Sequence, residues 1–382
     1  MKKLKKIVSI IIPLVILFSF PFQVFGEEEI DRDEYNNTLN SYDLSSFEKL
    51  DDDTYDFLKS AGFLDFDYEN LINLSFEDLK NEIVSILKGA VETPFKAMLS
   101  LLVFIILSSF FKSMKSSVRD DELSSMYSTV SALVISVVLL MKLKTTIALA
   151  CSTISVCSDF MFAFVPAFCA IVAASGSAVS AFSTNTLLLT LSQILNYISK
   201  NIFIPLSNAF LAIGICSGIR SELNLGGITA FLKKNITTAI SVCAAGFVSI
   251  LSIKTAVASR ADAIGLRSIR FAINSVVPVI GSAISEGLLS IQSYSSLIRS
   301  SVGVVGIIAV AVVFLPAIIE VAMWRLFLNL STLLSETFCD SSVSSVIKAF
   351  CDALLIMNVV LILSMVTTII SIGILVAAKG SA

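Results

Sequence analysis

The sequence predicts an all-α membrane protein, and two observations support that prediction. From Pro94 onward the chain is almost continuously apolar; overall it is 55% hydrophobic and 15% charged, with a mean hydropathy of +0.88. Runs such as 97–111, 303–319 and 353–378 have no polar face to offer to water. A helix that is apolar on all sides lies in lipid or in a very large core, and several such runs in 382 residues favour lipid.

The first 26 residues have the order of a secretory signal peptide. A basic start at 2–6 is followed by an apolar stretch, Ile7–Phe20, and by Val24 and Gly26 at the positions where small residues precede cleavage. We therefore expect residues 1–26 to be a signal peptide removed before Glu27. A retained anchor is the alternative, and both place the following residues outside the cytoplasm.

The next segment is strongly acidic. Residues 27–82 hold eighteen Asp and Glu against four Lys and Arg, whereas 83–382 hold twelve acidic and nineteen basic residues. Because a Lys and Arg surplus retains loops in the cytoplasm, this balance favours export, and we expect 27–90 to be extracytoplasmic. Two interpretations stay open, a docking surface for an outside partner and a solvated stalk. The segment contains enough aromatic residues for a small fold: Tyr55, Phe57, Phe63, Phe66, Tyr68 and Phe76.

Residues 94–382 are expected to form a multi-span helical membrane domain of about seven or eight spans. The basic joint at Lys112, Lys115 and Arg119 is expected to be cytoplasmic, which fits a first span that enters from outside. The expected spans are 94–111, 125–141, a broken segment within 146–174, 184–199, 201–219, 235–253, 302–322 and 353–378, with a re-entrant hairpin possible at 276–291.

This domain contains an internal repeat, with halves at about 127–235 and 236–345. Both 160–181 and 271–287 hold Val-Pro followed by small residues, and a second proline follows each at nearly the same distance. The candidate helix breaks are therefore Pro166, Pro205, Pro278 and Pro316. Broken helices at a repeat interface form the binding sites of many transporters. The alternative is that these prolines only kink helices for packing.

Three acidic residues interrupt the apolar block and are candidate conduit or helix-packing residues: Asp159, Glu286 and Glu320. A charge at mid-bilayer costs about 3 kcal/mol or more, so such residues face a partner, water or a pathway. Glu320 and Arg325 are five positions apart and cannot pair well within one helix, so each is expected to meet another helix. For Arg325 and Asp352 the sequence favours a place at the water boundary.

Several chemistries have no support in the sequence. It contains no histidine, no C-x-x-C pair and no phosphate-binding G-x-x-x-x-G-K-[ST] loop. The seven cysteines all lie in the apolar block, where they serve as small packing residues. We therefore expect a protein that is not an enzyme, with no catalytic residue, cofactor, metal or nucleic-acid partner.

Two stretches of this sequence resemble a known family. The segment 262–287, DAIGLRSIRFAINSVVPVIGSAISEG, and the segment 160–181, supported by Leu225-Gly226-Gly227 and Phe314-Leu315-Pro316, are similar to the stage III sporulation protein AE family of endospore-forming bacteria. The similarity covers nearly the full length and includes the signal peptide, the acidic segment and the multi-span body. It departs from the family at Glu286 and in the serine-rich stretch 290–301.

The resemblance implies a location and a role. Proteins of this family lie in the mother-cell membrane that surrounds the forespore, with the exported part in the intermembrane space. They belong to a channel or secretion-like complex with other stage III A sporulation proteins and stage II sporulation protein Q. The implied function is a membrane subunit of that complex, acting as translocation core or platform. The alternative is a stand-alone secondary transporter with a site at the repeat interface.

Overall fold

A computed structural model describes residues 32–66, 76–115, 121–177, 187, 190–219, 226–276, 281–339 and 341–377. The backbone alone is described for most of 76–90, for 111–115 and 121–125, and for most of 251–291. Of the described residues, those from 32 to 37 belong to one unit and those from Thr38 onward to a second. The expected signal peptide and Pro278 lie outside the described residues, and the proposed repeat is only partly covered by them.

The described backbone is almost entirely helical, with no strand in these ranges, which confirms the all-α class. Before the membrane domain come four short elements: α2 (Arg32–Leu39), η1 (Ser45–Lys49), α3 (Asp52–Ser60) and η2 (Phe63–Asp65). The long helices follow, and their bounds are α5 (Phe76–Lys115), α6 (Asp121–Val172), α8 (Ile204–Ile219), α9 (Gly226–Val276), α10 (Gly281–Phe338) and α11 (Ser341–Ala377). Two π-helical segments adjoin them, η3 (Ala173–Ser177) and η4 (Ser199–Phe203).

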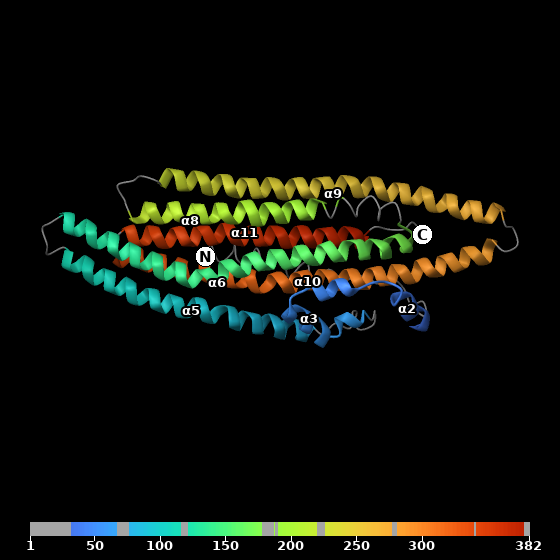
Figure 1. The fold of residues 1–382 in the computed structure, drawn as a ribbon, viewed down its shortest axis with the longest axis horizontal. Helices are drawn as coiled ribbons and strands as arrows, with labels where there is room; N and C mark the ends of the chain where they lie inside the picture. The colour runs from blue at the N-terminus through green and yellow to red at the C-terminus, as the bar shows by residue number, and fades with distance from the viewer. Residues whose placement is uncertain are drawn as a thin grey trace. The chain divides into compact units, whose positions relative to one another are not determined.

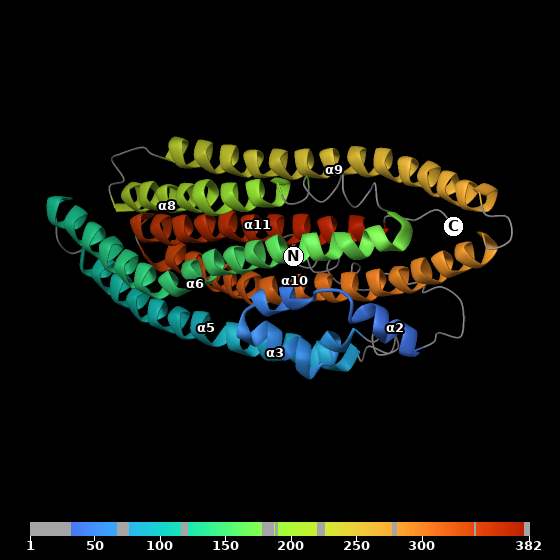
Figure 2. The ribbon, with the colours of Figure 1, turned by 45° about the vertical axis from the view of Figure 1, so that its right-hand side comes forward.

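Within the second unit, α11 is the central helix. It packs against α6, α8, α9 and α10, and Figures 1 and 2 show it between α8 and α10. Glycines allow α8 to approach it closely, because a Cβ at Gly214 or Gly218 would lie 2.5 Å from a side-chain atom of Ala349 or Val346. Small residues at such contacts are typical of membrane helices, where packing rather than hydrophobicity holds the helices together.

Five helical stretches in the described residues are long and apolar enough to cross a bilayer: Val91–Phe110, Met126–Gly176, Thr190–Ile219, Gln292–Phe338 and Ser341–Val376. The count of seven or eight is therefore too high for the part of the chain in view. Expected spans 125–141 and 146–174 are one helix, and so are most of 184–199 and 201–219. Basic side chains at these joints project from the helix surface and do not interrupt its backbone.

Two of the four prolines named as helix breaks lie inside continuous helices. Pro166 is within α6 and Pro316 is within α10, so the chain is not interrupted at either position. The backbone instead departs from α-helix at η3, where Gly176 adopts a left-handed φ of 88°. Pro205 lies within the continuous helical stretch Thr190–Ile219, directly after the π-helical segment η4, where the backbone departs from regular α-helix.

Residues 38–66 fold onto the helices that follow them. Phe47 of η1 is 2% exposed, and its ring lies 5.5 Å from that of Phe160 and 5.6 Å from that of Phe164, both on α6. On its other side Phe47 contacts Phe66 at 5.3 Å. The Tyr42 hydroxyl is also 3.2 Å from the Ser295 hydroxyl of α10. Residues 38–66 therefore use their aromatic side chains to cover the bundle, and they are not a free stalk.

Local hydrogen bonds shape this segment. Asp51 caps α3, since its carboxylate accepts from the Thr54 backbone N–H at 3.2 Å. Asp43 accepts from the Ser45 backbone N–H at 3.0 Å. Hydrogen bonds from the Ser45 hydroxyl and then from its backbone lower the pKa of the Asp43 carboxyl from its ordinary value.

Candidate functional site

A polar pocket of about 230 Å³ lies between α6 and the helical stretch at 190–201. Both helices are candidate membrane spans, so polar residues on them need an explanation. The pocket is lined by Ile154, Ser155, Ser158, Asp159, Gln193, Asn196, Tyr197, Lys200 and Asn201. Those from the second helix recur every three or four positions and therefore share one helix face.

Hydrogen bonds across the pocket join its two helices. Ser158 on α6 donates to Gln193 Oε1 at 3.0 Å, and Gln193 Nε2 donates back to the Ser158 carbonyl at 3.3 Å. Lys200 Nζ donates to Ser155 Oγ at 2.8 Å. The Gln193 amide is thus used on both its oxygen and its nitrogen, whereas Lys200 has further N–H groups to offer.

Two pocket residues keep unused hydrogen-bonding capacity. Asn196 is 6% exposed, and within the described part of the chain its buried Nδ2 has no hydrogen-bond partner. Asp159 is exposed and, among the same residues, forms no ion pair with Lys200 although both line the pocket. A buried amide nitrogen without an acceptor is unfavourable, so the pocket is incomplete as it stands.

Glu320 meets another helix, as the sequence predicts. Its Oε1 accepts from the Thr146 hydroxyl at 2.6 Å, which links α10 to α6. Thr146 and Asp159 are separated on α6 by thirteen residues, or about 20 Å of helix. Glu320 and Asp159 are therefore not brought together. The side chain of Glu286 lies outside the described residues.

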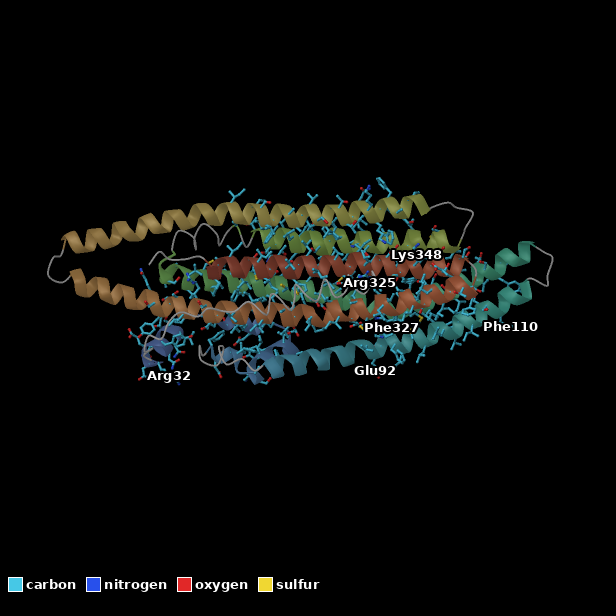
Figure 3. The ribbon with its side chains drawn as sticks, turned by 180° about the vertical axis from the view of Figure 1, so that it is seen from behind. Arg32, Glu92, Phe110, Arg325, Phe327 and Lys348 are labelled. Carbon is cyan, nitrogen blue, oxygen red and sulfur yellow. The ribbon has the colours of Figure 1, made fainter. Side chains whose placement is uncertain are left out.

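Charged residues gather at one level of the bundle, which we call the charged level. Contacts define it: the rings of Phe95 and Phe327 are 5.8 Å apart, the Cys351 thiol lies 3.8 Å from the Arg325 carbonyl, and Lys233 pairs with Asp352 at 2.6 Å. Figure 3 shows Glu92, Arg325, Phe327 and Lys348 at this level and Phe110 nearer one end. The charged residues flanking these contacts on five helices are Glu92, Lys96, Lys142, Lys144, Lys233, Lys234, Glu320, Arg325, Lys348 and Asp352.

Of the residues that line the pocket, the sequence predicts Asp159 alone. Ser155 and Ser158 are ordinary small residues of a membrane helix, and Lys200 looked like the end of a span. The available signal was the spacing 193, 196, 197, 200, 201, which is helical and polar inside an apolar stretch.

All seven cysteines are free thiols. In the part of the chain that the structure describes, no three cysteine or carboxylate side chains come close enough to hold a metal ion. The polar groups of the pocket and of Glu320 can bind by hydrogen bonds and charge.

The helices and the polar groups between them define the class first: this is a helical membrane bundle with a polar pocket between two of its candidate spans. Comparison with known proteins then gives the family. The sequence profile of stage III sporulation protein AE matches residues 61–379, and the chain belongs to that family.

One curated relative is the stage III sporulation protein AE of Bacillus subtilis (strain 168). It is 24% identical over 220 residues, which make up 57% of this chain and 55% of the relative. The match thus spans about half the length of that protein. No solved structure matches the chain.

Proposed function

We propose that this protein is a membrane subunit of a channel or secretion-like complex between mother cell and forespore, acting as translocation core or platform during endospore development. Its partners would be other stage III A sporulation proteins and stage II sporulation protein Q. The protein would lie in the mother-cell membrane around the forespore, with residues 27–90 outside the cytoplasm. No catalytic step is part of this role.

The observation that supports this proposal is the family match over 61–379 on a chain with five apolar helices. The family name gives a sporulation role, and the helices give a membrane location. Polar groups between candidate spans, at Glu320 and in the pocket, fit a protein that handles polar solutes or holds other polar subunits.

Deletion followed by complementation tests the proposal. Loss of the gene should block spore development while vegetative growth stays normal, and the full chain should restore spores. The protein should co-purify from sporulating cells with the stage III A proteins after crosslinking. Normal spore yield in the deletion strain would contradict the sporulation role, whereas spores blocked without co-purification would contradict membership of the complex.

Two neutralising substitutions separate a conduit from a platform. Asp159→Asn and Glu320→Gln, combined, should lower spore yield if these acids line the path of a solute. Glu336→Gln is the matched control, because Glu336 is an exposed acid on the same helix as Glu320. If the double variant forms spores normally while the deletion does not, the protein acts as a platform and the path lies elsewhere.

A stand-alone secondary transporter is the second candidate, and the pocket between α6 and 190–201 favours it. Such a protein needs no partner subunit for transport. The purified chain in vesicles should then accumulate a solute when an ion gradient is imposed across the vesicle membrane. Absence of uptake by the protein alone, with activity restored only in the assembled complex, would reject this candidate.

A further inference from the structure

The pocket on α6 is suited to a particular kind of ligand, and each polar group that lines it indicates one feature of that ligand. Asn196 Nδ2 is buried, lines the pocket and has no acceptor among the described residues. An amide NH₂ can only donate, so whatever completes this site presents an oxygen or another acceptor to it.

Lys200 also favours a ligand that carries a hydrogen-bond acceptor. Its ammonium carries three N–H donors, of which Ser155 Oγ takes one at 2.8 Å. Gln193 Oε1 accepts from Ser158, and it forms no hydrogen bond with Asn196 Nδ2. A cation and an amide N–H that line one pocket together favour an anionic oxygen, to which hydrogen bonds are strongest.

Asp159, in contrast, favours a ligand that carries a hydrogen-bond donor or a positive charge. An ionised carboxylate only accepts hydrogen bonds, and in the described part of the chain it has no cationic partner. The ammonium of Lys200 carries the charge that could neutralise Asp159, yet the two side chains are not within ion-pair distance. The pocket therefore keeps its two charges apart, and each is available to a group of opposite sign on a bound molecule.

We propose that this pocket binds a zwitterion that carries an ammonium and an anionic phosphate or carboxylate. The anion contacts Lys200 and Asn196, and the ammonium contacts Asp159. A volume of about 230 Å³ admits a head group or a small solute. The same chemistry occurs in an ethanolamine phospholipid head group and in a free amino acid. This inference goes beyond the proposed function and requires only the folded membrane protein.

The test uses the full chain, purified in detergent and stripped of lipid, with native mass spectrometry for lipids and calorimetry for solutes. The probes are phosphatidylethanolamine, phosphatidylglycerol, which lacks the ammonium, and the solutes O-phosphoethanolamine and glycine. We expect at least one zwitterionic probe to bind, and phosphatidylglycerol to bind about tenfold or more weakly than phosphatidylethanolamine, because it leaves Asp159 unpaired. Binding of the lipid alone identifies a head-group site, and saturable binding of a solute identifies a solute site.

Two substitutions connect binding to this pocket. Asp159→Asn and Lys200→Gln should each weaken the zwitterionic probe by about tenfold or more. Lys144→Gln is the matched control, because Lys144 is an exposed lysine of α6 that does not line the pocket, and it should leave binding unchanged. Circular dichroism melting of each variant checks that it is folded.

Three outcomes would overturn the proposal. The first is that no zwitterionic probe binds to the folded wild-type protein. The second is that binding is equal in wild type, Asp159→Asn and Lys200→Gln. The third is that phosphatidylglycerol binds as tightly as phosphatidylethanolamine and responds only to Lys200→Gln, which would make this an anion site. None of these results depends on sporulation, so they are independent of the proposed function.

Discussion

The two halves of α6 are equally helical but face different surroundings. Its first half exposes a series of large apolar side chains: Met126, Tyr127, Val130, Leu133, Val134, Val137, Leu140 and Met141. From Lys142 to Val172 the only large apolar side chain of the helix that is exposed is Phe162. The exposed positions there include Lys142, Lys144, Thr145 and Ser152. The change falls at the charged level.

The second half is apolar because protein covers it. Phe160, Phe164 and Phe168 form a stacked series with ring centroids 5.0 and 5.1 Å apart, and each is 0–1% exposed. Phe47 lies on one side of this series and Gly306 of α10 on another. The comparison teaches that hydropathy does not distinguish an apolar surface that meets lipid from one that meets protein.

Length points to the same division. A helix of 52 residues is about 78 Å long, whereas the hydrocarbon core of a bilayer is about 30 Å thick. We infer that lipid contacts the first half of α6 and that its second half is held within the protein. Four predictions test this difference.

The largest expected effect comes from removing a ring in the protein-covered half. Phe164→Ala should lower the free energy of unfolding by about 3 to 5 kcal/mol, because it leaves a cavity between α6, Phe47 and α10. Phe162→Ala is the control: that ring is 65% exposed on the same helix and should matter little. Thermal unfolding in detergent measures both. Equal losses of unfolding free energy in the two variants would mean that Phe164 is not packed in a core in the second half of α6.

A charge in the lipid-facing half should have the next largest effect. Val137→Lys places an ammonium on a surface that is 54% exposed, at a cost of about 3 kcal/mol if lipid covers it. Thr145→Lys starts from a side chain of nearly the same shape as valine and lies on an exposed position just past Lys142, within the charged level. Alkaline extraction of membranes gives the integrated fraction of each variant. If Thr145→Lys is lost from membranes as readily as Val137→Lys, the boundary at Lys142 is wrong.

Loss of the hydrogen bond that joins α6 to α10 should have the third largest effect on stability. Thr146→Val removes the donor to Glu320 without changing shape, and we expect about 2 kcal/mol of destabilisation. The neighbouring Thr145→Val removes only a 3.4 Å bond to the Lys142 carbonyl and serves as control. Melting temperatures in detergent compare them. Identical melting of the two variants would show that the Glu320 bond contributes nothing to stability.

The smallest expected effect is a single methyl group. Gly306→Ala would place a Cβ 2.8 Å from the Phe164 ring, so α10 must shift, at about 1 to 2 kcal/mol. Gly246→Ala on α9 meets nothing within 4 Å and should be neutral or slightly stabilising. The same melting experiment applies. A Gly306→Ala variant as stable as Gly246→Ala would indicate a loosely packed second half.

The sequence predicts the fold class well, because apolar runs of this length have few other solutions. The family follows from 160–181 and 262–287 together with the overall order of segments. The interhelical role of Glu320 also follows, since a carboxylate at that depth needs a partner.

The number of spans could not be obtained in the same way. Lys142 and Lys144 look like the end of a span, but a lysine can extend from the helix surface without ending it. Pro166 and Pro316 look like breaks, but membrane helices continue through prolines when neighbours satisfy the freed carbonyls. The cover that Phe47 provides is a long-range contact, which local patterns do not encode.

The position of Phe47 has a consequence for how the protein is made. It leaves the ribosome more than a hundred residues before Phe160 and Phe164, the rings that it covers. At about 5 to 20 residues per second, synthesis of that interval takes roughly 6 to 20 s. During this time the aromatic residues of 38–66 are in the nascent chain without their native partners on α6.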